Sequence, residues 1–222
     1  MASILLLAAL EDETSACFPD ITDTRHIGPY WLRRGRVGAH DISIATTGIG
    51  MVNCAAASAT FIHMLAPQLL LLAGTCGRLS NIKGDIFWVE SAVHHGYGTR
   101  HTGGFTHYRS GTMPFGAGEP IFFTAMEDPG CNLTHARMAS GDNFVGCADA
   151  AAQIVAATGA DIVDMETAAM AQVASRAQIP WGAIKAPTDD ADAAGGADFS
   201  ANLHRAAALS ADAIARLVAA LP

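Results

Sequence analysis

Acidic side chains follow three separate apolar segments of this chain, and together they could move protons. They are Glu11-Asp12-Glu13 after Ile4–Ala9, Asp164 and Glu166 after Ile162-Val163, and Asp189, Asp190 and Asp192 after Ala183–Ala186. Carboxylates serve as general acids and bases when they are held in place. Binding residues of α/β sheets gather where strands end, so these three strand ends are expected to converge. Solvation of ordinary surface acids is the alternative for each one taken alone.

Glu166 is less ordinary than the other acids. It lies in Val163–Met170, where an apolar strand is expected to end and an apolar helix to begin. Negative charge near a helix N-terminus stabilises the helix by ~0.3–1 kcal/mol, which is the structural alternative to a role in chemistry.

Two glycine-rich turns are candidates for ligand contact. Thr47–Asn53 follows an expected strand and opens an expected helix, but Asn53 stands where a dinucleotide fingerprint has its third glycine. An acidic ribose ligand is also missing about 20 residues later, so a Rossmann oxidoreductase is disfavoured. The second turn, Gly74–Gly77, fits either a tight turn or contact with a small ligand.

Other chemistries find less support. The nine histidines are scattered, and only His94 and His95 are adjacent, which in a strand sends them to opposite faces, so we expect no metal site. The chain has no G-x-S-x-G motif for a serine nucleophile. Lys185 is interpreted as a solvated or ion-paired lysine rather than a Schiff-base lysine. We expect no cofactor.

Composition limits the partners. The 222 residues carry 13 Lys+Arg against 21 Asp+Glu, a net charge of −8, which disfavours binding to nucleic acid or anionic lipid. Apolar runs such as Ile4–Leu10 are far shorter than the ~20 residues that cross a membrane, and we interpret the first run as a strand rather than a signal peptide. Five cysteines without a CxxC pair indicate a reducing, cytoplasmic compartment.

Short apolar runs alternate with alanine-rich stretches, a pattern typical of α/β proteins. Expected strands are Ile4–Ala9, Asp41–Thr47, Gln68–Ala73, Asp85–Val89, Arg137–Ser140, Asp161–Asp164 and Trp181–Ala186; expected helices are Val52–Leu65, Ala148–Thr158, Glu166–Ala177 and about Ser200–Leu221. A glycine- and histidine-rich middle spans Ser91–Glu119. We predict one domain over residues 1–222, with a central mixed β-sheet flanked by helices.

The order and spacing of several segments resemble one known family. The segments are Ala9–Glu13, Thr47–Gly50 with Val52, Gly74–Gly77, Gly84–Ile86, Ser140–Val145, Asp164–Glu166 and Thr188–Asp192, from where the match continues to Phe199. Over its whole length the chain resembles the 5′-methylthioadenosine/S-adenosylhomocysteine nucleosidases of the purine nucleoside phosphorylase superfamily. The resemblance implies a nucleoside phosphorylase-like fold and cleavage of a purine N-glycosidic bond.

The resemblance also implies roles for three acids. Asp189 would stabilise the departing purine through N7, which requires a raised pKa in a partly desolvated pocket. Glu13 would position and deprotonate the attacking water. Glu166 would hold the ribose hydroxyls beneath developing positive charge.

Substrate contacts follow from the same resemblance. Phe144 would stack on the base, and the Val145 backbone would read the purine edge. Further predicted binding residues are Ile49, Thr75, Met165, Thr188 and Phe199. The chain departs from the family where serine is common at Thr188, where Pro187 precedes it, where Arg78 replaces glycine, and over Val93–Pro114, the part that in the family helps a neighbouring subunit close over the 5′ group.

The superfamily includes phosphorylases, which bring arginines to a phosphate. Here Leu70–Ala73 holds none, and no arginine closely follows the first strand, so water is the expected nucleophile. Expected substrates are 5′-methylthioadenosine, S-adenosylhomocysteine and 5′-deoxyadenosine, with adenine released. Futalosine, aminodeoxyfutalosine or adenosylhopane as substrate, a phosphorylase, and a non-catalytic nucleoside-binding protein remain alternatives. A homodimer is expected by similarity.

Overall fold

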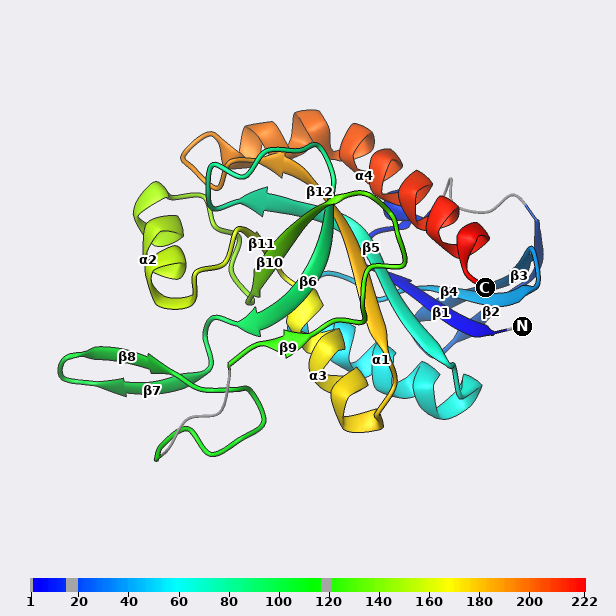
Figure 1. Cartoon of the computed structure of the whole chain (residues 1–222), viewed down its shortest axis with the longest axis horizontal. Helices are drawn as coiled ribbons and strands as arrows, with labels where there is room; N and C mark the ends of the chain where they lie inside the picture. The colour runs from blue at the N-terminus through cyan, green and yellow to red at the C-terminus, as the bar shows by residue number, and fades with distance from the viewer. Residues whose placement is uncertain (1, 15–19, 117–120) are drawn as a thin grey trace.

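The computed structural model describes residues 2–14, 20–116 and 121–222, and its main feature is one large mixed sheet (Figure 1). Its strand order is β11–β10–β6–β12–β5–β1–β4–β3–β2, with β9 paired to β6. The strands are β1 (Ser3–Ala8), β2 (Ile21–Ile27), β3 (Tyr30–Val37), β4 (His40–Thr46), β5 (Leu69–Arg78), β6 (Phe87–His94), β9 (Phe123–Thr124), β10 (Thr134–Ser140), β11 (Ile162–Asp164) and β12 (Trp181–Asp189). A separate hairpin pairs β7 (Gly98–His101) with β8 (Gly104–His107).

Helices cover the sheet on both faces. They are the 3₁₀ turn η1 (Glu11–Glu13), α1 (Met51–Leu65), α2 (Ala148–Thr158), α3 (Thr167–Ala177) and α4 (Gly195–Ala220). Alternate side chains of β1 separate the two cores, as the period of a strand requires. Leu5 and Leu7 pack in the cluster that contains α1 and α3, whereas Ile4 and Leu6 pack in the cluster that contains α4. Figure 1 shows α4 on one side of the sheet and α1 and α3 on the other. The predicted fold class is confirmed.

Part of the sheet closes on itself. β11 pairs with β10 in parallel and with β5 in antiparallel orientation, through Ile162↔Arg78 and Val163↔Gly77. Since β5 also pairs with β12, β12 with β6, and β6 with β10, these five strands form a closed ring. β1, β4, β3 and β2 extend the ring from β5 as an open sheet.

Ring closure corrects several predicted boundaries. β5 continues past Ala73 to Arg78, so Gly74–Gly77 lies inside a strand and is not a turn. β12 likewise continues past Ala186 to Asp189, because its pairing with β5 reaches Gly77. α4 begins at Gly195 rather than near Ser200. The antiparallel strands β2 and β3 were not predicted, because their polar and charged residues interrupt the apolar runs used to find the other strands.

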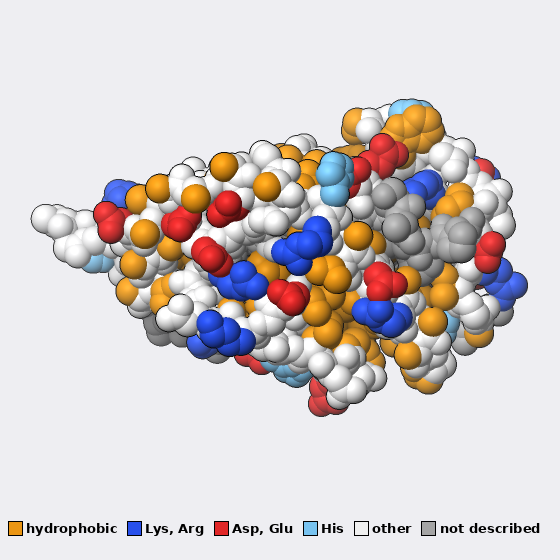
Figure 2. Space-filling view, turned by 90° about the horizontal axis from the view of Figure 1, so that it is seen from above, with side chains coloured by type: hydrophobic (Ala, Val, Ile, Leu, Met, Phe, Trp, Pro, Cys, Tyr) orange, Lys and Arg blue, Asp and Glu red, His pale blue; other side chains and the backbone are white. Residues whose placement is uncertain are grey.

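The predicted glycine- and histidine-rich middle contains the end of β6 and the β7–β8 hairpin, which projects from the body of the protein in Figure 1. Its residues 117–119 lie outside the described residues, as does Cys17; the other four cysteines are free thiols. Among the helices described, none has the length and apolar character needed to cross a membrane. On the face seen in Figure 2, acidic and basic side chains are intermingled.

Candidate active site

One cavity of about 280 Å³ brings together all ten residues predicted from the sequence. They are Glu13, Ile49, Thr75, Phe144, Val145, Met165, Glu166, Thr188, Asp189 and Phe199. The three acids come from η1, from the start of α3 and from the end of β12, far apart in the chain. Asp164 lines the same cavity, so four carboxylates meet there. The predicted convergence of acids is therefore present, while the role of each residue stays a prediction.

Glu13 is buried and held by backbone and side-chain donors. Its Oε2 accepts the N–H groups of Ala9 and Leu10, each at 3.0 Å. Its Oε1 accepts the N–H of Thr75 at 2.8 Å and the Thr75 hydroxyl at 3.1 Å. Hydrogen bonds to an ionised carboxylate are strong and directional, so this carboxylate has a defined orientation.

Gly74 lets a buried lysine approach Glu13. A Cβ on Gly74 would lie 2.8 Å from Lys185 Nζ and 2.9 Å from Glu13 Oε1, and φ there is +156°. The Gly74 N–H bonds Ser210 Oγ of α4 at 2.9 Å. The hydroxyl of Ser210 donates in turn to the carbonyl of Ile184 at 2.8 Å. Only glycine leaves space for both charged groups beside the β5 backbone.

Lys185 forms a buried ion pair with Asp164. Lys185 Nζ lies 2.9 Å from Asp164 Oδ2, and each side chain is 2% exposed. Burial alone would raise the pKa of Asp164, but Lys185 and hydrogen bonds from Ser140 and Thr167 hold that pKa below its usual value. Although burial opposes its charge, Asp164, Glu166 and Glu13 raise the pKa of Lys185. Of the two states predicted for Lys185, the geometry agrees with the ion-paired one, because the ammonium group is buried and not solvated.

Glu166 does not cap its own helix. Asp164 and Ser140 accept the first N–H groups of α3, from Thr167 and Ala168. The Glu166 carboxylate instead accepts the N–H of Gly50 at the start of α1, at 2.9 Å. Burial, reinforced by the charge of Asp164, raises the pKa of Glu166 to about 7. A proton on Glu166 is therefore lost near neutral pH.

Asp189 is also buried, in a setting that permits protonation. Burial and then the nearby acids Asp190 and Asp198 raise its pKa, although hydrogen bonds from Thr188 and Ala191 oppose the rise. Thr188 Oγ1 lies 2.7 Å from Asp189 Oδ2 and 3.2 Å from the Cys76 carbonyl oxygen. The threonine has one hydroxyl proton. That proton goes either to the Cys76 carbonyl or to Asp189, and the Asp189 carboxyl group is easier to protonate when it goes to Cys76.

Aromatic side chains form the mouth of the cavity. Phe144 and Phe199 meet edge to face, with ring centroids 5.9 Å apart and planes at 82°. Phe144 is 50% exposed and Ile49 is 49% exposed, so both present apolar surface at the opening.

A profile of the phosphorylase superfamily matches residues 4–221. The chain belongs to this superfamily. The 5′-methylthioadenosine/S-adenosylhomocysteine nucleosidase of Staphylococcus saprophyticus subsp. saprophyticus is 27% identical over 226 residues, covering 96% of this chain and 97% of the relative. The S-adenosylhomocysteine nucleosidase of Streptococcus pyogenes, solved with 5-methylthiotubericidin, has a TM-score of 0.86 at 26% identity, over 100% of this chain and 98% of that one.

A third comparison concerns the fold. The futalosine hydrolase of Helicobacter pylori strain 26695 has a TM-score of 0.87 at 23% identity, over 99% of this chain and 98% of that one. Together these findings confirm the family inferred from the sequence and, with it, the prediction of a purine nucleosidase of the hydrolase class.

Phosphorylases of the superfamily bring arginines to a phosphate, so the charged side chains around the cavity bear on whether phosphate or water is the nucleophile. Among the described residues, those lining the cavity include no lysine, arginine or histidine. Arg33 of β3 comes near, with Nη2 2.6 Å from Thr14 Oγ1 beside Glu13, but it does not line the cavity. Sequence reasoning missed Arg33 because it searched only Leu70–Ala73 and the residues that closely follow the first strand, whereas β3 carries this side chain back to η1.

Two further site residues lacked an assigned role. Asp142 Oδ1 accepts the N–H of Met51 at the start of α1, at 2.7 Å, one residue from the bond that Gly50 makes with Glu166. Asp164 both caps α3 and pairs with Lys185. Their segments, Ser140–Val145 and Asp164–Glu166, were noticed in the sequence, but partners that lie 21 to 91 residues away in the chain cannot be read from spacing.

Proposed function

We propose that the protein hydrolyses the N-glycosidic bond of 5′-substituted adenosines and releases adenine. The observation that carries the proposal is the meeting of three buried carboxylates with different surroundings around one cavity. Cleavage of this bond requires an acid at the leaving base, a base for water, and negative charge beneath a ribose that becomes cationic. One cavity offers a candidate for each task.

Asp189 is the acid in this proposal. Burial raises its pKa and so favours a proton on the carboxyl group, which can then stabilise the purine through N7 as the base departs. Phe144 and Phe199 stand on the same side of the cavity, where Phe144 would stack on the base at a gain of ~1–3 kcal/mol. The Val145 backbone reads the purine edge.

Glu13 is the base. Its oxygens are oriented by Ala9, Leu10 and Thr75, and a water molecule beside Oε1 would transfer its proton to the carboxylate as it attacks the anomeric carbon. Lys185 helps by offsetting the charge of the neighbouring acids. A nucleophilic water fits this cavity better than phosphate, because no cation lines it in the described part of the chain.

Glu166 binds the sugar. One carboxylate oxygen accepts the Gly50 N–H, so the other is free to accept the ribose 2′ and 3′ hydroxyls. Positive charge developing on the ribose favours the ionised form of Glu166 and so stabilises the transition state. Met165 packs on the ribose, while Ile49, Thr75, Thr188 and Phe199 line the rest of the site.

The choice of 5′ group rests on the relatives. The matched nucleosidases are named for 5′-methylthioadenosine and S-adenosylhomocysteine, and we propose these and 5′-deoxyadenosine as substrates. The structural likeness to a futalosine hydrolase keeps futalosine-type nucleosides as the second candidate. Exposed Ile49 and Phe144 at the mouth fit a homodimer in which a second copy covers the 5′ side, and a cytoplasmic location stays part of the proposal.

The test is adenine release, followed by chromatography, from 5′-methylthioadenosine in phosphate-free buffer. We expect full turnover without phosphate and a fall of at least ~10²-fold in kcat for Asp189→Asn, with an unchanged melting temperature. Asp192→Asn, a half-buried acid of the same loop that does not line the cavity, is the matched control and keeps its activity. Strict dependence on phosphate, or an active Asp189→Asn enzyme, would disprove the proposal. Faster turnover of futalosine would select the second candidate, and light scattering would decide the oligomeric state.

A further inference from the structure

Arg78 ties together the segments that surround Asp189. It is the last residue of β5 and pairs with Ile162 of β11, directly after Gly77, which pairs with Asp189. Its Nη2 donates to the carbonyl of Gly84 at 2.7 Å, and its Nη1 donates to Asp190 Oδ1 at 3.2 Å. One guanidinium group therefore joins the end of β5, the loop between β5 and β6, and the loop that follows Asp189.

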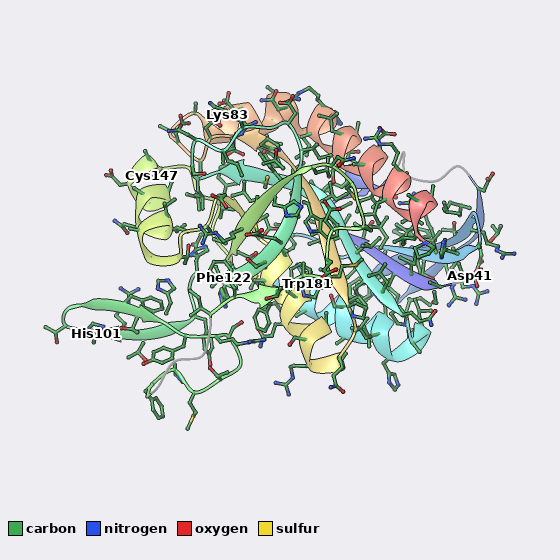
Figure 3. All side chains as sticks on the ribbon, viewed as in Figure 1. Asp41, Lys83, His101, Phe122, Cys147 and Trp181 are labelled. Carbon is green, nitrogen blue, oxygen red and sulfur yellow. The ribbon has the colours of Figure 1, made fainter. Side chains whose placement is uncertain are left out.

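The loop between β5 and β6, which Arg78 contacts at Gly84, lies outside the cavity. Residues 79–85 line a separate polar hollow together with Arg78 and Asp190, and Figure 3 marks it by Lys83 at the top of the molecule. The Arg78 side chain is 26% exposed and Asp190 is 69% exposed, so a strong stabilisation of the fold is not expected from this ion pair. Its position beside the proposed acid is the feature that needs an explanation.

The geometry points to Arg78 as a positioning residue for the reaction: it fixes the loop that follows Asp189 and neutralises Asp190 beside the acid. This inference rests on the proposed function of Asp189. Asp189 Oδ1 accepts the N–H of Ala191, so the orientation of the acid depends on the same loop that Arg78 holds through Asp190. A loop that shifts would carry the carboxyl group away from the purine.

Other ionisable groups also surround Asp189. Asp190 of its own loop and Asp198 of α4 act on Asp189, and Glu13, Asp164 and Glu166 line the same cavity. The Cys76 thiol of β5 lies near Asp189 and also near Asp164, Lys185 and Arg78. Asp164 and Lys185 pair with each other, and the Cys76 thiol stays neutral because burial raises its pKa. Asp190 is the acid that pairs with Arg78, and its negative charge raises the pKa of Asp189.

The sign of the effect follows. The acid works only when protonated, so kcat falls with rising pH as Asp189 ionises. In Arg78→Ala the full charge of Asp190 acts on Asp189, and we expect the alkaline limb of kcat to move up by roughly half a pH unit. Asp190→Asn removes that charge and moves the limb down by a similar amount. The double variant loses both charges, and because their effects on Asp189 add, its limb is expected close to that of the wild type.

The effect of Arg78 on the orientation of Asp189 is measured separately, through kcat and KM. Arg78→Ala lowers kcat at the pH optimum by up to roughly tenfold with a smaller change in KM, because the loop loses its support. Arg78→Lys keeps the positive charge but cannot bond Gly84 and Asp190 together as the guanidinium group does. The alkaline limb of its kcat profile should therefore stay close to that of the wild type while kcat itself falls. Arg36→Ala is the control, since Arg36 pairs with Asp41 at 3.4 Å on β3 and β4, away from the cavity.

The measurements are pH profiles of adenine release for these variants, with melting temperatures. An alkaline limb in Arg78→Ala that coincides with the wild type or moves down would overturn the inference. Asp190→Asn changes only an exposed side chain, so it folds and decides the charge effect even where Arg78→Ala does not. If Asp189→Asn stays active, the proposed function itself is wrong. If Asp189→Asn is inactive but the pH profiles of Arg78→Ala and Asp190→Asn coincide with the wild type, only the role of Arg78 is wrong.

Discussion

Replacing Glu166 by glutamine is expected to stabilise the protein at alkaline pH while removing its activity. The pKa of this buried carboxyl is raised from 4.5 to about 7, chiefly by burial. The folded state therefore binds the proton more tightly than the unfolded state, and stability falls as pH rises from about 4.5 through about 7. A difference of roughly 2.5 pKa units corresponds to ~3 kcal/mol.

Glutamine is the right perturbation because it keeps the carbonyl oxygen that accepts the Gly50 N–H at 2.9 Å. It removes only the ionisation. Urea unfolding of wild type and Glu166→Gln at pH 5 and at pH 8.5 gives two stability differences, and the variant is expected to gain ~2–3 kcal/mol relative to wild type between them. Activity is lost at both values, because the amide carries no negative charge for the sugar.

Exposed Glu127 provides the control, since Glu127→Gln should leave the pH dependence of stability unchanged. If wild type and Glu166→Gln lose stability in parallel between pH 5 and pH 8.5, the assignment of the proton to Glu166 is wrong. With Glu166 in its proposed role at the ribose, we expect it to set the acidic limb of the activity profile, which should rise near pH 7 in the free enzyme as Glu166 ionises.

Three other substitutions test the site. Lys185→Met leaves Asp164 buried without its partner and should cost ~3–5 kcal/mol in urea unfolding; a loss below ~1 kcal/mol would contradict the paired state. Gly74→Ala forces a methyl group against Lys185 Nζ and Glu13 Oε1, so we expect ~1–3 kcal/mol of destabilisation and a lower kcat, and normal kinetics would speak against the tight approach. Phe144→Ala should raise KM for 5′-methylthioadenosine roughly fivefold to a hundredfold with an intact melting curve; an unchanged KM would exclude stacking.

Sequence reasoning found the strands and helices that are continuous apolar runs. β1 and α2 are clear examples, because Leu5–Leu7 is buried on both faces and Ala148–Thr158 has the observed bounds. It missed β2 and β3, whose exposed outer residues are charged, and it ended β5 and β12 too early. The extra residues of β5 and β12 are strand only because distant segments pair with them, which no local pattern records.

The site shows the same division. The ten lining residues were named because a family resemblance supplied their spacing, and the cavity contains them all. The interactions that orient these residues or shift their pKa values could not be predicted from the sequence, because folding alone brings the partners together. Examples are Asp164 with Lys185, Asp142 with Met51 and Arg78 with Asp190. Burial is what changes the proton affinity of these acids, and burial is a property of the finished fold.

The closed ring of strands also bears on how the enzyme becomes active. Its seam joins Gly77 to Val163 and to Asp189, so the acid reaches its place only after the chain has been synthesised beyond Asp189, more than 100 residues after Gly77. Pairings of such long sequence separation are slow to form. During refolding, the leucine-rich strands should therefore become buried well before activity on a nucleoside returns. The time at which activity returns would then report when the ring of strands closes.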